Sequence, residues 1–80
     1  MTIQNDLFVA LKNKYLAQLS EAKATLSIYF NKSVGIGQHS QILVEMDKLL
    51  DDMSSANGKL QLLTTYFHQF DPTHPPDKKD

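Results

Sequence analysis

Apolar residues in the second half of this chain recur at alternating spacings of four and three residues, without interruption, from Ile42 to Phe70. Up to the last turn, the members of this row are Ile42, Met46, Leu49, Met53, Ala56, Leu60, Leu63 and Phe67. This alternation keeps the apolar side chains on one side of an α-helix and is typical of the seam of a left-handed coiled coil or a helical bundle. The row predicts one long amphipathic helix over about residues 40–70, with Ser40 as its N-cap and the apolar row as its core or dimer seam.

The segment SSANG, residues 54–58, is the one place that argues against a continuous second helix. A glycine such as Gly58 inside a helix costs about 1 kcal/mol relative to alanine. A break in the helix would reset the phase of the apolar row, yet Met53, Ala56 and Leu60 keep their register across it. We therefore predict one helix with a weak point at Gly58.

The first half predicts a second amphipathic helix, over about residues 6–30, a range that contains neither glycine nor proline. At about 100° per residue, seven of its apolar side chains fall on one narrow stripe. They are Phe8, Leu11, Tyr15, Leu19, Ala22, Leu26 and Tyr29. Asn5 or Asp6 can serve as its N-cap.

Two of the three glycines lie in the segment SVGIGQHS, residues 33–40, between the two predicted helices. A dinucleotide-binding fingerprint would need a glycine where Ser40 stands and a strand before the turn, and a phosphate-binding P-loop would need a GK[ST] sequence. Both are absent, so we interpret residues 31–39 as a turn in which Gly35 or Gly37 ends the first helix. No cofactor or small-molecule ligand is predicted.

The predicted fold is all-α: an antiparallel two-helix hairpin over residues 1–70, followed by a disordered tail, DPTHPPDKKD, over residues 71–80. Several apolar residues widen the two stripes beyond what one partner helix can cover. They are Leu16, Phe30, Leu43, Leu50, Leu62 and Tyr66. Two hairpins packed together would cover them, so we predict a homodimeric four-helix bundle.

Composition excludes several classes of function. The chain has no cysteine and three widely spaced histidines, so neither a disulfide nor a metal site is predicted. No nucleophile–base pair is recognisable, so we predict no catalytic residue and no enzyme. No apolar run approaches the roughly 20 residues of a membrane span, and no signal pattern is seen at the N-terminus, so we predict a soluble, cytoplasmic protein.

Charge offers one candidate site, a weak nucleic-acid contact through the lysines of the first helix: Lys12, Lys14, Lys23 and Lys32. Residues 1–32 carry four lysines and two acids, whereas residues 33–80 carry four lysines and seven acids. All eight cations are lysine, which argues against sequence-specific DNA recognition because such sites favour arginine. The alternative is that these lysines flank the bundle seam and face acids such as Glu45 and Asp52 on a neighbouring helix.

The segment Ile28–Leu50 carries an asparagine, a VGIG turn, a histidine one position later and an acidic–apolar helix. The matching residues are Asn31, Val34, Gly35, Ile36, Gly37, His39, Glu45 and Asp47. This pattern resembles a family of small T4-type bacteriophage proteins encoded beside the UvsW recombination helicase. Proline often stands there in place of Ser33 and Ser40, and glutamate in place of Gln38.

The resemblance implies a dimerising helical hairpin in the host cytoplasm, associated with phage DNA recombination and repair, with DNA or a recombination helicase as its partner. It transfers no functional residues. Two main hypotheses follow: a non-enzymatic accessory protein that binds DNA weakly through its lysines, or a protein–protein adaptor or regulator that binds no nucleic acid. A structural piece of a larger phage assembly is the third.

Overall fold

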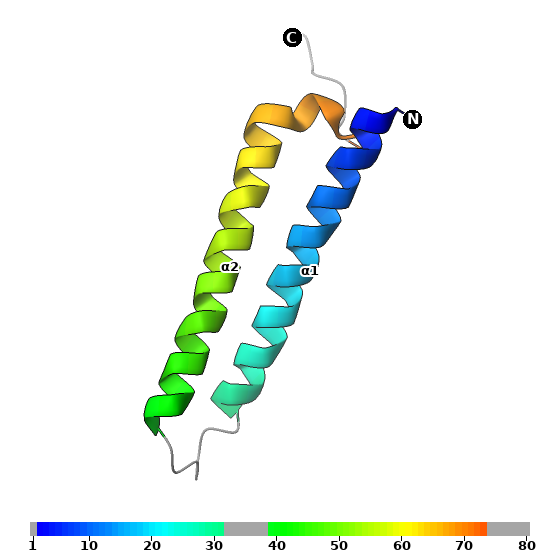
Figure 1. Cartoon of the computed structure of the whole chain (residues 1–80). Coiled ribbons are helices and arrows are strands. Elements are labelled where there is room, and N and C mark those ends of the chain that lie inside the picture. The colour runs from blue at the N-terminus through cyan, green and yellow to red at the C-terminus, as the bar shows by residue number, and fades with distance from the viewer. Residues whose placement is uncertain (1, 32–38, 74–80) are drawn as a thin grey trace, which may run out of the picture.

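The computed structural model describes residues 2–31 and 39–73. It contains helix α1 (Ile3–Asn31), helix α2 (His39–Phe67) and the short 3-10 helix η1 (His68–Phe70). The two long helices lie side by side and antiparallel, and η1 crosses from the end of α2 to the start of α1 (Figure 1). The predicted all-α hairpin is confirmed. The predicted glycine turn, with Gly35 and Gly37, lies at residues 32–38, outside the described residues.

Helix α1 begins earlier than the sequence pattern predicted, and Thr2 is its cap. The Asn5 backbone N–H donates to Thr2 Oγ1 (3.1 Å), and the Thr2 backbone N–H donates to Asn5 Oδ1 (3.1 Å). This reciprocal pair has the form of a capping box with asparagine in place of glutamate. The prediction that Asn5 or Asp6 is the N-cap is therefore wrong by one turn, since Asn5 supplies the returning side chain instead.

Helix α2 runs without a break through Gly58, which confirms the single helix predicted from the continuous register. It starts at His39, so Ser40 lies within the helix and is not its N-cap. The helix ends at Phe67, where the backbone (φ −131, ψ 20) leaves α geometry. Residues 68–70, predicted as part of the same helix, form the separate turn η1.

The interface between α1 and α2 contains the few buried side chains of the hairpin, which are Phe8, Ala22, Leu26, Ala56 and Leu63. The remaining residues of the predicted α2 row from Ile42 to Leu60 are half-buried in the same interface: Ile42, Met46, Leu49, Met53 and Leu60. Phe67 is different, with half of its side chain exposed, because α2 ends there and the chain turns away. The apolar row thus faces α1.

The hairpin is one layer of two helices, and its Cα atoms extend only 17 Å in the thinnest direction. A single layer leaves both broad sides open. Among the described residues, twelve large apolar side chains are exposed, against the five residues that are buried. The exposed residues are Ile3, Leu7, Leu11, Leu16, Ile28, Phe30, Leu43, Val44, Leu50, Leu62, Tyr66 and Phe67.

Candidate interaction surface

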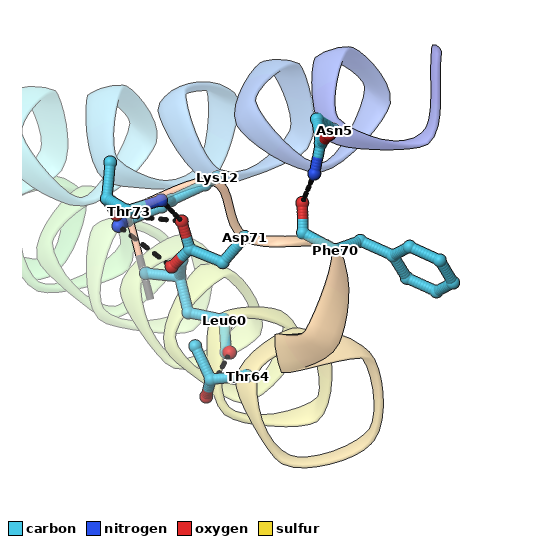
Figure 2. Close-up of polar contacts among 7 residues, drawn as sticks. All are labelled: Asn5, Lys12, Leu60, Thr64, Phe70, Asp71 and Thr73. Carbon is cyan, nitrogen blue, oxygen red and sulfur yellow. Dashed lines mark hydrogen bonds and ion pairs between the residues drawn. The ribbon is translucent and has the colours of Figure 1, made fainter. Parts of the chain in front are cut away.

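The end of the hairpin near the N-terminus is closed by the segment that follows α2. Asn5 Nδ2 donates a hydrogen bond to the Phe70 carbonyl oxygen (2.6 Å), joining residues 65 positions apart (Figure 2). Lys12 Nζ lies 3.8 Å from Asp71 Oδ2. Asp71 Oδ1 in turn accepts hydrogen bonds from the backbone N–H (2.9 Å) and hydroxyl (2.7 Å) of Thr73. Residues 71–73, predicted as the start of a disordered tail, therefore form an ordered turn against α1.

The contact of Asn5 with Phe70 is the part of this closure that the sequence did not predict. The Oδ1 atom of Asn5 accepts from the Thr2 cap while its Nδ2 reaches the last carbonyl of η1. A side-chain amide has an acceptor oxygen and an NH₂ donor on one planar group, so asparagine can complete both contacts at once. The T-x-x-N spacing of Thr2 and Asn5 was a visible signal for the cap, whereas nothing local indicated the contact with Phe70.

One broad side of the hairpin is polar along its middle. A groove of about 400 Å³ lies between the helices there, and it is lined by Gln18, Glu21, Ala22, Leu49, Asp52, Ser55 and Lys59. The Lys59 ammonium also lies 5.5 Å from the centre of the Tyr15 ring, a distance typical of a cation–π contact. Because both signs of charge line this groove, it presents no single-sign field to an ionic ligand. We call it the polar flank.

The opposite side is apolar. The stripe of each helix that faces its partner has two edges, and one edge of each stripe borders the polar flank. In an antiparallel pair, the other edges of the two stripes lie together on the opposite broad side. The heptad-spaced positions on this edge are Leu16, Lys23 and Phe30 of α1 and Leu43, Leu50 and Asn57 of α2. Leu16, Leu43 and Leu50 are 42%, 65% and 54% exposed. We call these six positions the apolar flank, and only Lys23 among them is charged.

The structure separates the lysines that sequence reasoning grouped as a nucleic-acid site. Lys12 is half-buried and pairs with Asp71, Lys23 lies on the apolar flank, and Lys14 lies on the same side of α1 as the polar flank. Lys32 lies outside the described residues. The three described lysines therefore form no continuous basic surface on the single hairpin.

A metal-ion site and a membrane span both need features that the described ranges lack. Within residues 2–31 and 39–73, histidine and acidic side chains nowhere gather into a group of three that could hold a metal ion. No helix in this part of the chain is both long enough and apolar enough to cross a membrane. The side chains of His39 and Ser40 are not among those described.

The fold and its surfaces define this chain as a small all-α helical hairpin with a polar groove on one broad side and exposed leucines on the other. No protein family, curated protein or solved structure matches the chain at a significant level.

Proposed function

We propose that this chain is a non-enzymatic protein-interaction module that works as a homodimeric four-helix bundle. The observation that carries the proposal is the excess of exposed over buried apolar side chains, twelve large residues against five, among the described residues. Soluble monomers rarely expose contiguous apolar surface of this kind unless it is an interaction site. An 80-residue hairpin with a core one layer deep also has little burial of its own to stabilise it, and a second copy would supply more.

The geometry favours this adaptor function over the other hypothesis, weak DNA binding through the lysines of α1. Neutralising several phosphates at once needs cations gathered along one groove. Lys12, Lys14 and Lys23 point to different surroundings, and Lys12 already has a carboxylate partner. The association with phage recombination, which the family resemblance implied, stays a prediction.

Two measurements test the proposal. Sedimentation equilibrium over about 5 to 200 μM protein should give a dimer that dissociates on dilution. A stable monomer throughout this range would refute the bundle. Fluorescence anisotropy with labelled single-stranded, duplex and branched DNA at about 50 and 200 mM salt should show no binding that salt weakens. Salt-sensitive binding lost when Lys12, Lys14, Lys23 and Lys32 are changed to Gln would favour the DNA hypothesis instead.

A further inference from the structure

We infer that the surface on which the second copy docks is the apolar flank, and that the polar flank faces outward in the dimer. This inference rests on the proposed self-association and specifies its geometry. It is argued from the distribution of exposed residues over the two broad sides, from the area available and from the charge at the rim of the flank.

The two broad sides differ in what a second copy would have to bury. Covering the polar flank would remove Glu21, Asp52 and Lys59 from water, and burying charges is costly unless every one is paired. Covering the apolar flank would bury Leu16, Leu43 and Leu50, all now exposed. Exposed apolar residues also lie on the side of the polar flank, at heptad spacing from its lining residues Glu21, Ser55 and Lys59: Leu7, Ile28, Leu62 and Tyr66. They lie toward the two ends of the hairpin, so a second copy that covered them would also cover the charges between them.

The chain already covers part of the side on which the apolar flank lies. Asn5 and Lys12 lie on the same edge of α1 as Leu16, and both contact the segment that follows α2. Beyond Lys12 no described segment of the hairpin crosses this side, so the stretch from Leu16 toward the end of α1 is left open (Figure 1). That open stretch is where a second hairpin can lie.

The size of the open stretch suits a dimer of modest affinity. From residue 16 to residue 30 a helix rises about 21 Å, and two adjacent helices span about 20 Å. The face is thus about 400 Å² in projection, and two interdigitating copies would remove roughly 1,000 Å² of accessible surface, near the lower limit for a specific interface. We therefore expect a dissociation constant in the micromolar range.

The charge on the apolar flank does not prevent two copies from packing flank to flank. Lys23 is its only charged member, and a lysine can lay its methylenes on an apolar surface while its ammonium stays at the rim.

The test compares two leucines of nearly equal exposure on the same helix. Leu50 is 54% exposed on the apolar flank, and Leu62 is 57% exposed on the side of α2 that carries the polar flank, seven residues after Ser55. Leu50→Gln should weaken the dimer by about tenfold to a hundredfold, because each dimer loses two partly exposed leucines, whereas Leu62→Gln should leave the dissociation constant within about twofold. Both are measured by sedimentation equilibrium, with circular dichroism to compare helix content.

A gain-of-contact variant keeps the inference testable if Leu50→Gln unfolds. Asn57→Leu places a third leucine on the apolar flank, one heptad after Leu50, so it should tighten the dimer by about tenfold. An unchanged or weaker dimer would count against the apolar flank. If the wild-type chain is a dimer but both leucine variants behave alike, the apolar flank is wrong and self-association stands. If the wild-type chain is monomeric throughout, self-association itself fails.

Discussion

The hydrogen bond between Asn5 and Phe70 ties the end of η1 to the first turn of α1, and its removal gives a quantitative prediction. Asn5→Ala removes two separate interactions. Loss of the Nδ2 bond to the half-buried Phe70 carbonyl costs about 1 kcal/mol, and loss of the Oδ1 acceptor for the Thr2 cap costs about another 1 kcal/mol. Together they should lower the free energy of unfolding by about 2 kcal/mol.

Two further variants separate the two interactions. Thr2→Ala removes the hydroxyl that accepts from the Asn5 backbone N–H, so it should cost about 1 kcal/mol through the cap alone. Asn5→Asp keeps an oxygen for the cap but loses the donor to Phe70 and places a carboxylate beside a carbonyl. Its main effect should therefore be on the turn that η1 makes rather than on the start of α1.

Two measurements test these variants, one of the stability of the whole hairpin and one of the turn at η1. Urea unfolding followed by circular dichroism gives the free energies, at one fixed protein concentration because self-association would make stability depend on concentration. Amide exchange of Asp71, whose N–H donates to the His68 carbonyl (3.0 Å), reports the turn. In Asn5→Asp that amide should exchange about fivefold faster, whereas in Thr2→Ala it should be unchanged. The reasoning is refuted if Asn5→Asp exchanges like the wild type and Asn5→Ala costs no more than Thr2→Ala.

Four other substitutions have outcomes set by local geometry, and urea unfolding measures each. Gly58→Ala should raise the free energy of unfolding by about 1 kcal/mol, because a Cβ added there meets no atom within 4 Å; an unchanged value would contradict this assignment of Gly58 to an open helical site. Lys12→Gln should lower the free energy of unfolding by less than about 1 kcal/mol, and by less still at high salt. Asp71→Asn should lower it more, because that carboxylate is only 13% exposed and also accepts from Thr73. Equal losses for the two substitutions would contradict this ordering. Ala56→Leu should cost about 1–3 kcal/mol, because Ala56 is 1% exposed between the helices, and a neutral outcome would mean that the interface has room for a larger side chain.

Helical periodicity explains why so much of the hairpin could be predicted from the sequence. The row from Ile42 to Leu63 names the side of α2 that packs on α1, because a side chain's direction on a helix is fixed by its position in the heptad. The same argument carried α2 correctly through Gly58. Phe67 and Phe70 continue the row in sequence but not in space, since spacing alone does not show that the backbone leaves helical geometry at Phe67.

What periodicity could not supply is the relation between segments far apart in the chain. The periodicity of each helix defines the two edges of its own interface stripe. Which edge of α1 lies on the same broad side as which edge of α2 depends on how the helices are paired. The groove that brings Gln18 and Glu21 beside Asp52 and Lys59 settles that pairing, and with it the composition of the opposite side. The contact from Asn5 to Phe70 spans 65 positions and likewise has no local signature.

Self-association through the apolar flank and DNA binding through the lysines of α1 would both use Lys23. If the second copy docks on the apolar flank, Lys23 lies at the interface and Lys12 stays with Asp71, so Lys14 is the one described lysine of α1 left free to meet a phosphate. The two Lys14 side chains would then lie on opposite outer sides of the dimer. Each can neutralise about one phosphate, which corresponds to a slope of about −0.9 in the logarithm of affinity against the logarithm of salt concentration. DNA binding by the dimer with a much steeper slope would therefore require cations beyond α1, such as Lys48 and Lys59 of α2 or residues outside the described ranges, or a dimer that leaves the apolar flank open.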